Sequence, residues 1–257
     1  MAEKVLLVER DGPVVVVTLN RPGQVNALNA ELRAALRETV AALESETELR
    51  IAILKGAGRG FCAGADLASG LEHPISEHIA REYQPALVGI ANNRLIWIAQ
   101  VHGSAAGIGA AFAMNCDLMT MTPDAYLYMA FAAISLIPDG GNTWLLLRRM
   151  GYPRALQTIL EGRRIPASEC QALGIANKVL EPDRIDAETR HWARELAAGP
   201  PLAIAAAKRL LRNSGSLSLE DAILAEGLEQ NPLVKSEDFQ EGVAAFFAKR
   251  RPIFKGR

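Results

Sequence analysis

The sequence predicts an α/β fold in which a largely parallel sheet is covered by helices and followed by a helical C-terminal region. Two observations carry this prediction. Short β-branched runs alternate with helical patterns through roughly the first 160 residues, and helical patterns dominate from Ile165 onward. The chain has 257 residues, of which 49% are hydrophobic, which is enough for a large, well-packed core.

The N-terminal elements follow the order of a βαβ unit. Residues 5–8 and 14–19 are β-branched runs, and Asp11-Gly12-Pro13 between them predicts a hairpin turn. Asn29 is expected to cap a helix, and residues 51–55 read as a buried strand after it. The apolar stripe of this helix consists of Leu32, Leu36, Val40 and Leu43.

The middle of the chain continues the alternation. A helix is expected from about Ile75 into the nineties, and Pro85 should kink or split it because proline lacks a backbone N–H. Strands are expected over 95–101, 117–121 and 125–129, and a helix over 140–150.

The C-terminal part is expected to be helical. Ser218 and Ser236 supply N-terminal caps, with acidic residues in the turns that follow them. We expect a core over residues 1–195 and a helical region over 196–257. The predicted helices cover 167–173, 185–198, 202–211, 217–230 and 236–249.

Composition excludes several classes of protein. The 28 Lys and Arg residues nearly balance 29 Asp and Glu residues, so no bulk field would attract nucleic acid or an anionic membrane. Cys62, Cys116 and Cys170 form neither a disulfide framework nor a zinc pattern. No apolar run has the length of a membrane span, and early charges do not fit a signal peptide. We therefore expect a cytoplasmic protein.

Two loops rich in small residues are the most informative segments. The first covers residues 59–67 (RGFCAGADL), and the second covers 102–117 (HGSAAGIGAAFAMNCD) and opens a helix. Small residues let the backbone approach a ligand closely, and a helix start exposes N–H groups. Two backbone donors from two such loops could stabilise a developing oxyanion.

These loops belong to an ordered set of motifs that resembles a known family. The set comprises Leu19-Asn-Arg-Pro22, Asn26-Ala-Leu-Asn29, Phe61-Cys-Ala-Gly-Ala-Asp-Leu67, His102-Gly103 with Ala106-Gly-Ile-Gly109, and Ile137-Pro-Asp-Gly-Gly141. In its order and spacing the set resembles the crotonase (enoyl-CoA hydratase/isomerase) superfamily. The resemblance implies a ClpP-like spiral of stacked ββα units with a C-terminal helical region that mediates trimer formation. It also implies acyl-CoA thioester substrates and a homo-trimer or dimer of trimers. No metal or redox cofactor is implied, because coenzyme A enters as part of the substrate.

The resemblance also assigns an oxyanion hole. By motif position, its two backbone N–H groups fall on Ala65 and Ile108. The second position is often glycine in hydratases of this family. An isoleucine still supplies an N–H, provided that its backbone angles suit a residue with a side chain.

The acid–base residues depart from the hydratase pattern. Hydration of an enoyl thioester needs one group to activate water and one to protonate C2. The family's two glutamate positions fall on Ala111 and Phe131, neither of which can carry a proton. Asp139 remains, at a position where related isomerases and dehalogenases carry a catalytic aspartate. The segment around it most resembles the ring-1,2-epoxyphenylacetyl-CoA isomerase and Δ3,Δ2-enoyl-CoA isomerase branch.

The resemblance therefore implies that Asp139 moves a proton between carbons while the Ala65 and Ile108 N–H groups hold the enolate. An apolar lining should raise the pKa of Asp139 and make it a better base. Arg21, Lys55 and the basic segment 249–257 could meet the CoA phosphates. The full set of expected substrate contacts is Arg21, Val25, Ala27, Leu28, Ala63, Asp66, Leu67, Gly107, Ala111, Phe131, Pro138 and Trp144.

Other interpretations stay open at this point. Asp139 could simply cap the helix that follows it, and the basic C-terminal segment could be only a solvated surface. An atypical hydratase could recruit another acid, and the candidates are Glu72, Glu77 and Glu82. A protein of the same fold could also bind acyl-CoA without turnover. Asp117 is expected to be structural, and Cys62 is expected to be a packed residue rather than a reactive thiol.

Overall fold

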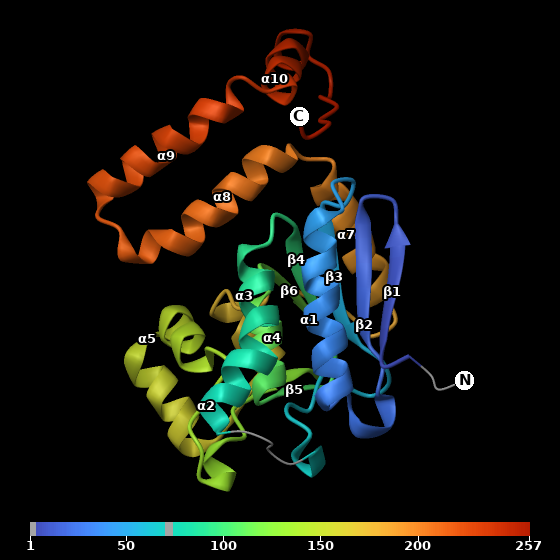
Figure 1. Ribbon diagram of the computed structural model, residues 1–257, viewed down its shortest axis with the longest axis vertical. Helices are drawn as coiled ribbons and strands as arrows, with labels where there is room; N and C mark the ends of the chain where they lie inside the picture. The colour runs from blue at the N-terminus through green and yellow to red at the C-terminus, as the bar shows by residue number, and fades with distance from the viewer. Residues whose placement is uncertain (1–3, 70–73) are drawn as a thin grey trace.

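The computed structural model describes residues 4–69 and 74–257, and its central element is a mostly parallel sheet of six strands (Figure 1). The strand order is β1-β2-β3-β4-β6-β9, and only the β1–β2 pair is antiparallel. The strands are β1 (Leu6–Asp11), β2 (Val14–Leu19), β3 (Ile51–Gly56), β4 (Ile96–Val101), β6 (Leu118–Met121) and β9 (Lys178–Val179).

The predicted hairpin and βαβ unit are confirmed. Strands β1 and β2 pair around the Asp11-Gly12-Pro13 turn, and β2 then pairs in parallel with β3. Helix α1 (Ala30–Ser45) makes the crossover between β2 and β3. The Asn29 side chain caps it by accepting a hydrogen bond from the Leu32 N–H at 3.0 Å. Each of the four apolar residues predicted to form the stripe of this helix is at most 2% exposed, because the helix packs that face against the sheet.

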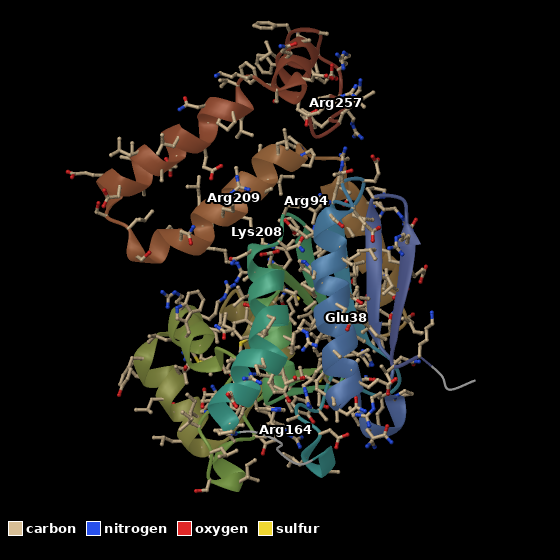
Figure 2. The ribbon with its side chains drawn as sticks, viewed as in Figure 1. Glu38, Arg94, Arg164, Lys208, Arg209 and Arg257 are labelled. Carbon is tan, nitrogen blue, oxygen red and sulfur yellow. The ribbon has the colours of Figure 1, made fainter. Side chains whose placement is uncertain are left out.

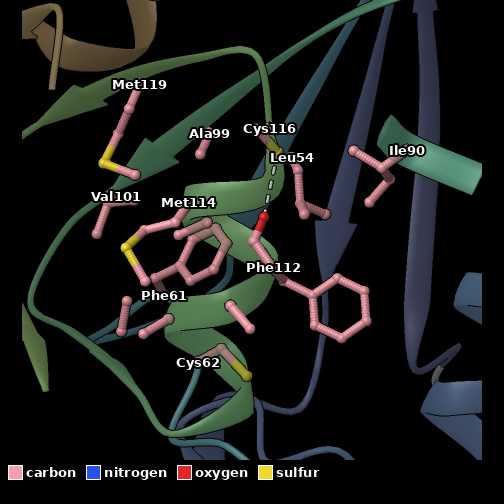
Figure 3. Close-up of a cluster of buried hydrophobic side chains, with 14 of the residues drawn as sticks. Leu54, Phe61, Cys62, Ile90, Ala99, Val101, Phe112, Met114, Cys116 and Met119 are labelled. Atoms are coloured by element: carbon pink, nitrogen blue, oxygen red, sulfur yellow. Dashed lines mark hydrogen bonds between the residues drawn. The ribbon is translucent and has the colours of Figure 1, made fainter. Parts of the chain in front are cut away.

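Helices cover both faces of this sheet (Figure 1). On one face lie α1, α3 (Gln84–Asn92) and α4 (Ile108–Asn115), which share a core with alternate residues of the strands. On the other face lies α7 (Ile185–Ala197), packed on the remaining alternate positions. Figure 3 shows α4 surrounded by side chains of the core, in keeping with its almost wholly apolar sequence.

A second, three-stranded sheet has the order β5-β7-β8. Its strands are β5 (Ser104–Ala106), β7 (Tyr126–Tyr128) and β8 (Arg164–Pro166). Only the β7 region was predicted as a strand. The other two have three residues each, which is too short for alternation of apolar and polar residues to be visible in the sequence.

The predicted helix from Ile75 is present, and it is divided just before Pro85, as expected. Helix α2 (Ile75–His78) leads through a π-helical turn, Ile79–Tyr83, directly into α3. Pro85 lies in the first turn of α3, where its missing N–H costs little. The π-helical turn was not predicted.

The predicted helix over 140–150 is longer than expected. Helix α5 (Asn142–Glu161) continues past a kink at Gly151, whose φ of 72° and ψ of 165° break the helical path. Helix α6 (Ala167–Ala172), which was predicted over residues 167–173, follows β8. Short 3₁₀ turns lie at Pro22–Gln24, Leu67–Ser69, Ala132–Ile134 and Ser214–Ser216.

The last three helices extend away from the sheet as a C-terminal arm (Figure 1). They are α8 (Pro201–Asn213), α9 (Leu219–Leu233) and α10 (Glu237–Phe247). The predicted caps are confirmed, because the Ser218 and Ser236 hydroxyls accept hydrogen bonds from the N–H groups of Asp221 and Phe239.

Ion pairs near Lys208, which is labelled in Figure 2, attach this arm to the core. The Lys208 ammonium lies 2.7 Å from the Asp117 carboxylate and also donates to two carbonyl oxygens of the core. Arg212 donates to the other Asp117 oxygen at 2.8 Å. The structural role expected for Asp117 is thus confirmed. Within the described ranges, no helix combines the length and apolarity that crossing a membrane requires.

Candidate active site

The two glycine-containing loops lie side by side and are joined by backbone hydrogen bonds. The Phe61 N–H donates to the His102 oxygen and the Cys62 N–H to the Ser104 oxygen, both at 3.0 Å. The Ala106 N–H donates back to the Cys62 oxygen at 2.8 Å. The first loop therefore runs as an extra extended segment along β5, and this pairing brings together two segments that are 41 to 44 residues apart in the sequence.

Close packing between the loops depends on glycine. A Cβ on Gly64 would lie 2.9 Å from the Ala106 oxygen and 3.7 Å from the Gly107 Cα. A Cβ on Gly109 would lie 2.7 Å from the Cys62 oxygen. Side chains at these two positions would push the loops apart, so the small residues serve the approach of backbone to backbone.

Neither of the two N–H groups singled out in the sequence, those of Ala65 and Ile108, has a backbone acceptor among the described residues. Around Ala65, the bridge to Leu28 uses the Gly64 oxygen and the Asp66 N–H, so the Ala65 N–H takes no part. Ile108 is the first residue of α4, and its N–H has no acceptor within the helix. Gly107 before it takes a φ of 54° and a ψ of −127°, whereas Ile108 has no positive φ. The isoleucine therefore fits the backbone without strain.

Asn26 holds the first loop from beneath, and it was missed as a functional residue in the sequence. It is fully buried, and its Nδ2 donates to carbonyl oxygens of Ala57, Gly60 and Phe61 at 2.9, 2.9 and 3.1 Å. Its Oδ1 accepts from the Arg21 N–H. A signal did exist: asparagine tolerates the left-handed backbone, and Asn26 has a φ of 56°.

Asn142 supports the second loop, as Asn26 supports the first. It is fully buried in the first turn of α5, and its Nδ2 donates to the Gly107 oxygen at 3.0 Å. This bond ties the start of α5 to the peptide group that carries the Ile108 N–H. No pattern in the sequence indicated this contact, because it joins two segments through a single side chain.

Asp139 lies in the turn between Pro138 and α5, next to the second loop. A Cβ on the adjacent Gly140 would overlap Ile108 Cδ1 and lie 2.9 Å from the Ala111 Cβ, so the turn packs directly on α4. Burial raises the pKa of the Asp139 carboxyl, and a backbone hydrogen bond opposes that rise only in part. Its Oδ1 is buried and has no hydrogen-bond partner among the described residues.

Three further residues expected to contact the substrate, Phe131, Pro138 and Trp144, differ in how far they are exposed. Pro138 is buried. Phe131 is 7% exposed, and its ring end would be 3.7 Å from a Cβ on Gly107. Trp144 is 45% exposed and lies under the Arg148 guanidinium, 3.7 Å from its ring centroid. Phe131 thus lies against the second loop, whereas Trp144 faces outward.

The expected contacts of the first loop form a connected group. The Arg21 guanidinium donates to the Asp66 carboxylate at 2.9 Å and also to the Ala27 oxygen. The Ala63 N–H donates to the Val25 oxygen at 2.8 Å, and Val25 has a φ of 48°. In this group Leu28 is fully buried and Leu67 is 74% exposed.

Most of the proposed phosphate-binding cations already have partners in the chain. Lys55 forms an ion pair with Asp186. In the basic C-terminal segment, Arg250 pairs with Glu241, and Arg257 pairs with Glu237. These pairs fold the end of the chain back onto α10.

The other carboxylates proposed for a hydratase are placed as follows. Glu77 lies 3.2 Å from Arg81, and Glu82 lies 3.3 Å from Arg33. Glu72 lies outside the described residues. Cys62 is a packed residue, as predicted: it is 1% exposed, and burial raises its pKa to about 12. Within residues 4–69 and 74–257, no three His, Cys, Asp or Glu side chains gather as a metal site would require.

Comparison with known proteins gives a consistent result. The model of the enoyl-CoA hydratase/isomerase family matches residues 9–257. A probable enoyl-CoA hydratase from Rhodobacter capsulatus is 39% identical over 249 residues, which is 95% of each chain. The 1,2-epoxyphenylacetyl-CoA isomerase of Escherichia coli is 34% identical over 250 residues, again 95% of each chain. The crystal structure of an enoyl-CoA hydratase from Bacillus anthracis superposes with a TM-score of 0.93 at 29% identity, covering 98% of this chain and 100% of that one. This likeness confirms the fold predicted from the motifs.

Proposed function

The chain belongs to the enoyl-CoA hydratase/isomerase family, and from this premise we propose that it is an enoyl-CoA isomerase. It acts on an acyl-CoA thioester by moving a proton between carbons of the acyl group. One observation carries the proposal: Asp139, with a raised pKa, lies beside the second loop, while Ala111 and Phe131 cannot carry a proton.

In the proposed reaction the thioester oxygen accepts hydrogen bonds from the Ala65 and Ile108 N–H groups. Asp139 removes a proton from C2 of a 3-enoyl thioester, and negative charge moves onto the thioester oxygen. The two N–H groups stabilise this dienolate, which is the largest contribution to lowering the barrier. Protonated Asp139 then returns the proton to C4, and the double bond lies between C2 and C3.

Surroundings of low polarity favour this use of one carboxylate. The turn that carries Asp139 packs on Ile108 and Ala111, and burial disfavours the ionised carboxyl. A base whose pKa is raised binds the transferred proton more firmly, so it can take a proton from an activated carbon more readily. Asn26 and Asn142 support the two loops that present the N–H groups.

The second candidate function is hydration of a 2-enoyl thioester, which is favoured by the names of several relatives. The Rhodobacter capsulatus relative is named a probable hydratase, and a 2,3-dehydroadipyl-CoA hydratase of Escherichia coli is 33% identical over 254 residues. A hydratase would need a second acid. Two of the three candidates, Glu77 and Glu82, form ion pairs with arginines. An ion pair favours the ionised carboxylate, so these two residues are less suited to act as the acid.

We also propose that the C-terminal arm assembles copies of this chain into a trimer or a dimer of trimers. Apolar side chains on α9 and α10 support this, because large exposed apolar groups mark association surfaces. Leu219, Leu228, Phe246 and Phe247 are each at least 70% exposed. Measurement of the mass in solution tests this part separately from the activity.

The function is tested by incubating the purified protein with a 3-enoyl-CoA and, separately, with a 2-enoyl-CoA. The proposal predicts conversion of the 3-enoyl to the 2-enoyl thioester, with a loss of at least about 10³-fold in Asp139→Asn because the proton carrier is gone. Water addition to the 2-enoyl substrate that survives this substitution would instead establish the hydratase. Saturable binding without any chemistry would mean an acyl-CoA-binding protein.

A further inference from the structure

Tyr83 is a buried phenol that no part of the proposed mechanism uses. It is the last residue of the π-helical turn, and it is 2% exposed. Its ring meets the His78 ring edge-on, with centroids 5.4 Å apart, and the Arg33 guanidinium lies 5.5 Å from its centroid. Such π-helical turns often occur at functional sites, where they redirect a side chain.

Two buried polar atoms lack hydrogen-bond partners in the described structure. The Tyr83 hydroxyl and Asp139 Oδ1 are each shielded from solvent, and each has no hydrogen-bond partner. Burial raises the pKa of Tyr83 to about 12, Arg33 opposes that rise, and the negative charge of Asp139 adds to it. The two groups therefore lie within electrostatic reach of one another, and the phenol stays protonated at any ordinary pH.

A neutral phenol and a carboxylate are complementary as donor and acceptor. An unpaired polar atom in the interior is unfavourable, and a hydrogen bond to a charged group is stronger than one to a neutral group. A hydrogen bond between these two atoms would satisfy both at once.

We propose that Tyr83 is a positioning residue for Asp139: its hydroxyl donates a hydrogen bond to Oδ1 in the working site. Oδ2 is then left to exchange the proton with the substrate carbons. This inference rests on the proposed function, because it presupposes that Asp139 is the proton carrier. It adds the residue that sets the orientation and basicity of that carrier.

A hydrogen bond to the carboxylate favours its ionised form and therefore lowers the pKa of Asp139. Burial acts in the opposite direction. Without the phenol, the pKa of Asp139 would rise further, and the base would be protonated over a wider range of pH. The other charged or titratable groups that face Tyr83, directly or through Arg33, are Cys62 from the first loop, His78 from α2, Arg33 and Arg37 from α1, and Glu82.

The test is the pH profile of kcat/KM for a 3-enoyl-CoA in Tyr83→Phe, with Tyr152→Phe as the matched control. Tyr152 is 67% exposed and lies on α5, so its variant should behave as the wild type. We expect the acid limb to move up by about one pH unit in Tyr83→Phe, with the rate at high pH changed less than about threefold. The melting temperature should not fall, because the removed hydroxyl has no hydrogen-bond partner among residues 4–69 and 74–257. An unmoved acid limb would overturn the inference.

Two further variants separate the possible failures. If Asp139→Asn keeps full activity, the proposed function itself fails. If Asp139→Asn is inactive and the Tyr83→Phe profile matches the wild type, only the positioning role fails. His78→Gln checks that the acid limb is not that of His78, whose ring contacts Tyr83. Loss of the limb in that variant would also overturn the inference.

Discussion

Asp139 shows how one side chain couples the stability of this protein to pH. Burial raises the pKa of its carboxyl in the folded state, while the unfolded chain titrates near the ordinary value. The carboxyl therefore favours the folded state below that ordinary pKa, and this contribution is lost as the pH rises through the folded pKa.

Asp139→Asn should consequently gain stability relative to the wild type as the pH rises. At about pH 3 both proteins carry a neutral group at this position, and at pH 7 only the wild type buries a charge. Chemical denaturation at the two pH values measures the difference. Asp124→Asn, at an exposed position, is the control and should show no such trend. A constant difference for Asp139→Asn would contradict the raised pKa.

Asn26 is the residue on which the first loop depends most. Asn26→Ala removes one group that donates to three carbonyl oxygens and one that accepts from a backbone N–H. Because the partners stay buried, we expect a loss of about 2–4 kcal/mol in the free energy of unfolding. We also expect a lower kcat from the displaced Ala65 N–H. Asn20→Ala removes a single exposed bond to the Lys4 oxygen and should cost less than about 1 kcal/mol.

At the scale of elements, helix α4 and the first loop form one packed unit. Gly109→Ala would place a methyl group 2.7 Å from the Cys62 oxygen and 2.8 Å from its Sγ, although alanine is the better helix former. The clash should destabilise the protein by about 1–3 kcal/mol and reduce kcat as the loops separate. Thermal unfolding and steady-state kinetics measure the two effects.

Gly227→Ala in α9 is the matched control for Gly109→Ala. A Cβ there meets nothing within 4 Å, so the same change should stabilise the protein by about 0.5–1 kcal/mol. Equal effects at the two positions would show that packing against Cys62 does not matter.

The elements also show what the sequence could predict. The βαβ unit, the helices of the arm and their serine caps follow from periodicity and capping, because these are local signals of many residues. Strands β5, β8 and β9 were missed because two or three residues show no period. The π-helical turn before α3 has no local signature, so Tyr83 was missed along with it.

The residues of the candidate site also fall into those that the sequence could predict and those that it could not. Ala65, Ile108 and Asp139 could be picked out because motifs mark their positions. Asn142 and Tyr83 act across the fold through single side chains, and only the packed structure brings them to the loops. The proposed phosphate contacts depended on charge alone, which does not reveal that Lys55 already pairs with Asp186.

At the scale of the whole molecule, the ion pairs of Asp117 hold the arm on the core. Lys208 is 6% exposed, and burial lowers its pKa while Asp117 opposes that shift. Asp117→Asn would leave this ammonium buried with no carboxylate beside it, so we expect a loss of about 3–5 kcal/mol in the free energy of unfolding. The added substitution Lys208→Met should recover a large part of that loss. If the double variant is no better than the single one, the buried charge is not the cause.

The most direct test of the account follows a label through the reaction. A 3-enoyl-CoA that carries two deuterium atoms at C2 is converted by the wild-type protein, and the position of deuterium in the product is determined by NMR. Because one carboxylate carries the proton, the account predicts a 2-enoyl thioester that has lost one deuterium from C2 and carries part of that label at C4. A 2-enoyl product with no deuterium at C4, or recovery of the unchanged 3-enoyl substrate with both deuterium atoms at C2, would contradict it.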